Sequence, residues 1–260
     1  TYYDDEELKF ALYHEVFHAI QNEYMSSLSM YRNRWFIEAT ADYAAASFSG
    51  LPHLMGKGIT HRFLEKSITY DPDVNDQHKY QLAHFLKYSF GTNFKEMFEY
   101  VANDSWYETC ITSLGSFVKS KGGGSFAQKY QEFARHYVFE SNSPGPEIED
   151  TLRTEVGVDP QTLRYGEESV EGSFDLEADY SAKVWGVWID NDDDGYKYLK
   201  AEVPGGIPDR VEIDVFRVAD DSVRTGGKVG TLSKNSNSLT FRTFPGDSVY
   251  MLAVNVNFQT

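Results

Sequence analysis

The sequence predicts an α+β protein, with a mainly helical first part followed by a small antiparallel β-sandwich. Apolar residues recur at helical spacing over the first ~140 residues, whereas from about residue 180 they alternate with polar ones. The composition agrees with a folded chain, because 260 residues with 41% hydrophobic and 15% aromatic side chains supply a sizeable core. Disordered, collagen-like and low-complexity proteins are excluded on the same grounds.

The helical part is expected to cover residues 1–145. Its first helix follows an acidic start, which suits a helix N-terminus, and carries apolar residues such as Leu8, Leu12 and Val16 at helical spacing. Gly91 is expected to end one helix as a left-handed cap, and Asn93 to cap the next. The further helices are predicted at residues 34–48, 75–90, 94–101 and 125–140.

A turn-rich stretch at residues 141–146, followed by an acidic segment, marks the change to the second part. We expect a linker at residues 146–178 and the sandwich at residues 179–260. Between residues 211 and 215 and again between 250 and 258, apolar side chains occupy every second position. Short strands of this kind, separated by turns rich in Gly, Asn, Asp and Pro, are typical of an antiparallel sandwich.

Charge and cysteine content exclude several kinds of partner and site. With 40 acidic and 24 basic residues the net charge is −16, so nucleic acid and anionic membranes are poor partners. No apolar run approaches the roughly 18 residues of a membrane-spanning helix, so no membrane insertion is expected. Cys110 is the only cysteine, which excludes an intrachain disulfide and a thiolate metal cluster. Its neighbours suggest a small buried hydrophobic residue.

Residues 14–18 read His14-Glu15-Val16-Phe17-His18 and lie inside the first predicted helix. The spacing of four places both imidazoles on one helical face, close enough to share a metal ion. The glutamate beside them can serve as general base to a metal-bound water. The alternative is a pair of histidines on a partly buried face that bond to neighbouring carbonyls. On these five residues alone both interpretations stay open.

The second predicted helix adds two carboxylates. Glu38 follows His18 by 20 residues, which is enough for one helix to end and a neighbouring helix to present a ligand. Two imidazoles and one carboxylate form a catalytic zinc set whose fourth position is left for water. Asp42, one turn further along, can accept the remaining N–H of a zinc-bound histidine. The surrounding residues are too apolar for an ordinary solvated helix face.

These two motifs resemble those of the gluzincin metallopeptidases, a group that includes thermolysin, the zinc aminopeptidases and bacterial collagenases. The resemblance rests on HExxH at residues 14–18 and on WxxEAxAxY at residues 35–43. It implies that His14, His18 and Glu38 bind zinc, that Glu15 is the general base, and that Asp42 supports His14. A looser likeness extends to about residue 140 and implies a zincin-type catalytic domain. It does not cover the C-terminal part.

A metallopeptidase of this kind also needs a donor for the oxyanion. The segment at residues 79–88 is similar to the helix that supplies a tyrosine in aminopeptidase-like members, and this likeness implies Tyr80 as the donor. Ala83 departs from the pattern, because relatives often have glycine there. His84 and Tyr88 follow on the same face and are the reserve candidates. Core packing is the alternative for all three.

The expected activity is zinc-dependent hydrolysis of peptide bonds in a protein or peptide substrate. Only 13 residues precede His14, whereas the family carries an upstream sheet that binds substrate. Two expectations stay open: the cleft lacks this wall, or the chain is a fragment and the wall lies elsewhere in a longer protein. Endo- and exopeptidase action both stay open. The sandwich is expected to bind substrate, cell wall or another protein, and the acidic, tyrosine-rich composition favours a secreted or cell-surface bacterial or archaeal enzyme.

Two other functions remain open. The first is a binding or adhesion protein that keeps a peptidase scaffold without turnover, which the missing wall favours and the intact motif, including Glu15, opposes. The second is a structural zinc ion that ties two helices together.

A second metal site is suggested by the acidic run at residues 190–195. Asp190, Asp192 and Asp194 occupy alternate positions before Gly195, as at the start of a calcium loop. The twelfth position is Ala201, where an EF-hand needs a bidentate glutamate, and the flanks read as strands. The run is therefore not an EF-hand. A calcium site and an acidic hairpin turn are both open.

Overall fold

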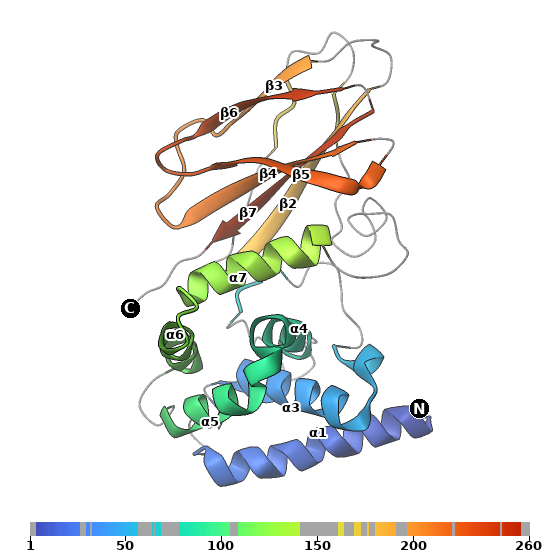
Figure 1. Ribbon diagram of the computed structural model, residues 1–260, viewed down its shortest axis with the longest axis vertical. Coiled ribbons are helices and arrows are strands. Elements are labelled where there is room, and N and C mark those ends of the chain that lie inside the picture. Colours follow the sequence, from blue (N-terminus) through green and yellow to red (C-terminus); the bar gives the residue numbers. More distant parts are fainter. Residues whose placement is uncertain are drawn as a thin grey trace. The chain divides into compact units, whose positions relative to one another are not determined.

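The chain is α+β, with its helices in the first half and antiparallel sheets in the second (Figure 1). It forms two compact units. The described residues of the first are those up to 56 and those from 68 to 133, and those of the second are 64, 66–67 and the ones between 134 and 255. The predicted turn at 141–146 and most of the predicted linker lie outside the described residues, so those boundaries stay predictions. The computed structural model describes residues 4–26, 30–31, 33–56, 64, 66–68, 78–104, 109–140, 161–163, 169–172, 176, 180–190, 197–219, 222–244 and 246–255.

The predicted helices are confirmed, and one further helix, α6, was not anticipated from the sequence. No helix in these described ranges is both long enough and apolar enough to cross a membrane. Cys110, the first residue of α6, is fully buried as expected. The helical elements are α1 (Asp5–Tyr24), α3 (Arg34–Ser49), the 3-10 turn η1 (Pro52–Leu54), α4 (His78–Phe90), the 3-10 turn η3 (Gly91–Asn93), α5 (Phe94–Asp104), α6 (Cys110–Ser120), α7 (Phe126–Arg135) and the π-helical η4 (His136–Glu140).

Local sequence explains where α1 and α3 begin and end. Asp4 and Glu7 form a capping box at the start of α1, in which the Asp4 carboxylate accepts from the Glu7 N–H at 2.7 Å. Gly50 ends α3 with a φ of 74°, the left-handed conformation that glycine adopts without steric cost. The two helices pack side by side (Figure 1), and this pairing positions the site described below.

The cap predicted at Gly91 is wrong. This glycine is not among those with positive φ, and it opens the 3-10 turn η3 that leads directly into α5. Its carbonyl accepts a hydrogen bond from the Tyr43 hydroxyl at 3.2 Å, which holds the turn against α3. The chain therefore changes direction without entering the left-handed region.

Helix α1 turns its apolar stripe outward. Leu8, Leu12, Val16 and Ile20 are 61%, 63%, 49% and 40% exposed, although their spacing is what predicts the helix. The buried side chains of α1 are instead His14, Phe17 and Gln21. Periodicity therefore predicted the element correctly but did not tell which face packs, because the inward face carries the polar side chains of the site.

The second unit contains a five-stranded sheet in the order β1-β2-β7-β4-β5 and a two-stranded sheet of β3 and β6. Every neighbouring pair is antiparallel except β1 and β2, which run parallel and so depart from the predicted pattern. The central strand β7 is buried along almost its whole length. The strands are β1 (Gln161–Leu163), β2 (Ser181–Ile189), β3 (Lys197–Glu202), β4 (Val211–Ala219), β5 (Ser222–Leu232), β6 (Ser238–Thr243) and β7 (Ser248–Asn255).

Side chains of both sheets meet in one hydrophobic cluster, which includes Val215 of β4, Leu232 of β5 and Phe241 of β6. The sandwich itself stays a prediction, because only two strands of the second sheet lie in the described part of the chain. Asp214 differs from the expected alternation of buried apolar and exposed polar residues. It is only 1% exposed, accepts a hydrogen bond from the Thr231 hydroxyl and forms an ion pair with the Lys228 ammonium.

Candidate metal centre

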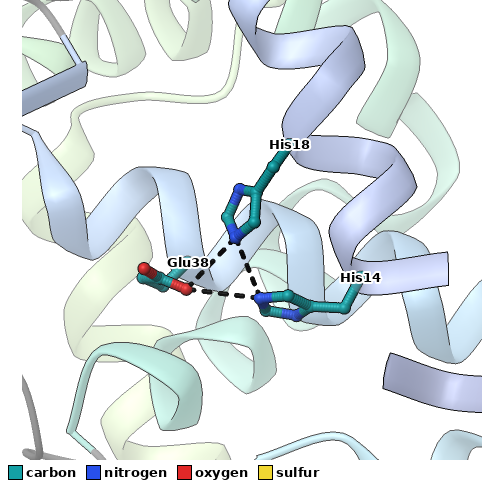
Figure 2. A group of neighbouring side chains, drawn as sticks. All are labelled: His14, His18 and Glu38. Carbon is teal, nitrogen blue, oxygen red and sulfur yellow. Dashed lines mark hydrogen bonds and ion pairs between the residues drawn. The ribbon is translucent and has the colours of Figure 1, made fainter. Parts of the chain in front are cut away.

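The three residues predicted as metal ligands converge at one point between α1 and α3 (Figure 2). The Nε2 atoms of His14 and His18 lie 3.0 Å apart, and Glu38 Oε2 lies 3.3 Å from the first and 3.4 Å from the second. The side chains are partly buried, with 11%, 21% and 17% of their surface exposed. Figure 2 shows both rings of α1 pointing at the carboxylate from α3.

This donor set fits a zinc ion. Ligand atoms at zinc–ligand distances of roughly 2.0–2.2 Å in a tetrahedron stand about 3.3–3.6 Å from one another. The observed separations of 3.0, 3.3 and 3.4 Å are close to that edge length. A single proton between two of the three atoms would leave the other two pairs of atoms without a hydrogen between them. A cation shared by all three satisfies every lone pair at once.

Asp42 lies beside His14, as predicted. Its Oδ1 is 3.5 Å from His14 Nδ1, and the carboxylate is buried with 5% of the residue exposed. The other oxygen, Oδ2, accepts a hydrogen bond of 2.6 Å from the backbone N–H of Gly56. This second contact was not predicted from the sequence. This hydrogen bond fixes the Asp42 carboxylate with Oδ1 facing Nδ1 of His14, while Nε2 of the same ring faces Glu38.

Gly56 is expected to be the less replaceable of two left-handed glycines. It has a φ of 64°, and an added Cβ would lie 2.8 Å from His84 Nε2, whereas Gly50, at φ 74°, faces open space. Gly50→Ala should lower the free energy of unfolding by about 1 kcal/mol because of the backbone conformation. Gly56→Ala should lower it by at least ~1 kcal/mol more, because the added Cβ clashes with His84. Urea unfolding of the two metal-free variants measures the difference. Equal losses would contradict the packing described here.

Gln21 and Lys79 border the site and were missed in the sequence. His18 Nδ1 lies 2.6 Å from Gln21 Oε1, and Gln21 is fully buried one turn further along α1. Lys79 is 3% exposed, with its ammonium 4.0 Å from Glu38 Oε1. The spacing of three from His18 could have identified Gln21. Lys79 gave no signal, because a buried lysine cannot be told from an exposed one by residue type.

The ligands perturb one another's pKa in the absence of an ion. Burial lowers the pKa of His14, but the hydrogen bonds and charges of Asp42 and Glu38 outweigh it and raise this pKa from 6.5 to about 9. Burial alone would raise the pKa of Glu38, yet hydrogen bonds from the two histidines hold it well below its usual range. The metal-free site therefore binds protons where a metal would bind, so the two compete.

Two further predicted residues lie near the ligands. The Tyr80 ring is 5.9 Å from the His14 ring, centroid to centroid. Burial and then the charges of Glu38 and Asp42 raise the pKa of Tyr80 to about 12, so its hydroxyl stays protonated and can donate. Glu15 is exposed on α1, and its charge is close enough to contribute to the same shift.

The reserve donors lie elsewhere. The His84 ring lies against Gly56, and its Nε2 is buried without a hydrogen-bond partner. The Tyr88 ring, 40% exposed, packs on Phe133. Neither contact involves the three predicted ligands, whereas the Tyr80 ring lies beside that of His14. The role of Tyr80 as oxyanion donor stays a prediction.

The predicted calcium loop lies mostly outside the described residues and stays a prediction. Asp190 directly follows β2, while Asp192 and Asp194 lie outside the described residues. Within the described ranges, His14, His18 and Glu38 are the one group of His, Cys, Asp and Glu whose ligand atoms lie close enough to hold an ion.

A scan against protein-family models, a search of curated proteins and a search of solved structures each found no match to this chain. The gluzincin resemblance therefore stays a prediction that rests on the two motifs.

Proposed function

We propose that this chain is a zinc-dependent metallopeptidase that hydrolyses peptide bonds in a protein or peptide substrate. The observation that carries the proposal is the convergence of two imidazole nitrogens and one carboxylate oxygen at 3.0, 3.3 and 3.4 Å. Two histidines and a glutamate are the ligand set of a catalytic zinc site. When bound, zinc supplies a Lewis acid for the substrate carbonyl and lowers the pKa of water.

The remaining chemistry belongs to side chains of the chain itself. Glu15 follows the ligand His14 directly and is solvent-exposed, so its carboxylate is free to take the proton of the attacking water and return it to the leaving amine. Tyr80, kept protonated by its raised pKa, can donate a hydrogen bond to the oxyanion that forms on the carbonyl. Asp42 orients His14 through the ring nitrogen that faces away from Glu38.

The number of ligands favours catalysis over a purely structural ion. Structural zinc sites are closed by four protein ligands, whereas catalytic sites use three and leave a position for water or substrate. Only His14, His18 and Glu38 converge among the residues described. A helix-tying zinc ion without turnover is therefore the weaker of the two proposals.

Metal analysis of the protein purified without added zinc tests the proposal. About one zinc per chain is expected, and none in His14→Ala, because a three-ligand site that loses one imidazole is too weak to keep its ion. His53→Ala is the matched control, since His53 is exposed and pairs only with the exposed Glu6 in the contacts described. It should retain the metal. Absence of zinc from the wild type, even after zinc is added, would contradict the metal centre.

A further inference from the structure

We infer that Gln21 is a positioning residue that fixes the tautomer of His18, so that the Nε2 lone pair of this ring is aimed at the ion. The inference rests on the proposed zinc site and identifies the group that holds its second histidine. Gln21 is fully buried at the contact between α1 and α3, and its amide touches both helices.

The amide group of Gln21 uses both of its donor hydrogens on α3. Its Nε2 lies 2.8 Å from the backbone carbonyl oxygen of Ile37 and 2.8 Å from the Thr40 hydroxyl. The Thr40 hydroxyl donates its own hydrogen back to α3, with its oxygen 2.7 Å from the carbonyl of Phe36 and 3.1 Å from that of Ile37. Since both of these carbonyls can only accept, the Thr40 oxygen receives its hydrogen bond from Gln21.

This arrangement determines which way the amide of Gln21 points. In the flipped orientation, Oε1 would face the carbonyl oxygen of Ile37, and two acceptors would meet in a fully buried place. The amide oxygen must therefore face away from α3. There it lies 2.6 Å from Nδ1 of His18.

An amide oxygen is an acceptor only, so Nδ1 of His18 must carry the hydrogen of that bond. A neutral imidazole has one hydrogen, which leaves a lone pair on Nε2. That Nε2 is the atom 3.0 Å from His14 Nε2 and 3.4 Å from Glu38 Oε2. The tautomer required for metal binding is thus determined by carbonyl groups of α3, through Thr40 and Gln21.

The same contacts join the two helices that carry the ligands. Gln21 and His18 belong to α1, while the acceptors belong to residues 36–40 of α3, the turn that includes Glu38. The two histidines are held differently, because Asp42 offers His14 a carboxylate and Gln21 offers His18 a neutral amide. A neutral acceptor fixes the ring but raises its basicity less than a carboxylate does.

The test compares zinc affinity in three variants, measured by competition with a chromophoric chelator. Gln21→Met keeps the length of the side chain and removes its hydrogen bonds, so affinity is expected to fall about 10–100-fold. Gln21→Glu keeps an acceptor for His18 Nδ1 and, once burial protonates its carboxyl, one donor for the Ile37 carbonyl, so its zinc affinity is expected to fall less than that of Gln21→Met. Asn33→Leu is the matched control, because Asn33 is also a buried amide, 4% exposed, and bonds the backbone N–H of Cys110.

A merely structural role for Gln21 gives a different pattern. In that case Gln21→Met and Asn33→Leu would show similar losses of melting temperature and similar zinc affinities. Gln21→Glu would then bind zinc no more tightly than Gln21→Met. Nitrogen-15 NMR of the metal-free wild type at alkaline pH gives a direct readout, with the hydrogen of the neutral His18 ring expected on Nδ1. A hydrogen on Nε2 would overturn the inference.

The two proposals fail in different ways. If the wild type binds no zinc, the metal centre is overturned and the role of Gln21 with it. If the wild type and Gln21→Met bind zinc equally, the metal centre stands and only the role of Gln21 is overturned. Should Gln21→Met not fold, the affinity of Gln21→Glu and the position of the His18 hydrogen in the wild type decide the matter.

Discussion

Replacing Glu15 by glutamine is expected to lower kcat/KM for peptide cleavage by about 10²–10⁴-fold, the usual contribution of a general acid–base group. Glutamine has nearly the same shape but cannot accept the proton of the attacking water. Glu15 is not one of the three converging ligands, so the variant should still contain about one zinc per chain. Cleavage of a library of internally quenched peptides, beside metal analysis of the same samples, measures both quantities.

The control for this experiment is Glu23→Gln. Glu23 is also an exposed glutamate of α1, two turns beyond Glu15, and loses the same charge when replaced. Its cleavage rate should match the wild type, which separates the role of Glu15 from a general effect of net charge. Equal cleavage by Glu15→Gln and the wild type would remove Glu15 from the mechanism. Loss of zinc from Glu15→Gln would place it in the metal set.

Zinc affinity is expected to rise about 100-fold between pH 7 and pH 9 as His14 loses its proton. In the metal-free protein the neighbouring carboxylates raise the pKa of His14 to about 9, so at pH 7 this ring carries a proton that zinc must displace. One displaced proton gives roughly a tenfold change in affinity per pH unit below that pKa. The pKa of His18 is raised as well, mainly by its bond to Glu38 against the effect of burial, so the dependence steepens at lower pH.

Calorimetry in two buffers of different ionisation enthalpy counts the protons directly. His14 should contribute about one released proton per zinc at pH 7 and none well above pH 9. His53→Ala should show the same profile, since this histidine is exposed and its described ion pair is with Glu6, not with a ligand. Affinity that is independent of pH in this window would contradict the coupling of His14 with Asp42 and Glu38.

The local patterns of the first helices predicted much of the site. A capping box, an alanine-rich segment with a glycine stop and two motifs were enough to place His14, His18 and Glu38 on neighbouring helices. Each of these signals lies within a few residues of the atoms it positions. Gly56 could not be found in this way, because its N–H reaches Asp42 only after the chain turns back on itself. Lys79 likewise comes from another helix, α4, whose packing no local pattern reveals.

The sheets illustrate the same limit. Alternation of apolar residues predicted β4 and β7, but it carries no information on which strand lies beside which. β2 pairs with β7 and β1 runs parallel to β2, and both contacts join segments far apart in the sequence. Asp214 was expected on the exposed face and is buried, since charged and hydroxyl groups of β5 compensate its carboxylate. Partners of this kind depend on strand register, which the period of two does not determine.

The way α1 docks has a consequence for its cohesion with the rest of the helical unit. Of its buried side chains only Phe17 is apolar, and the others, His14 and Gln21, belong to the site or support it. An ion held by His14, His18 and Glu38 would cross-link α1 to α3, and its binding free energy would oppose local unfolding of α1. A chelator would then act as a local denaturant of this helix. After removal of the metal, the backbone amides of α1 would be the first of the helical unit to exchange with solvent deuterium. Metal loss would therefore weaken the packing of α1 on the rest of this unit.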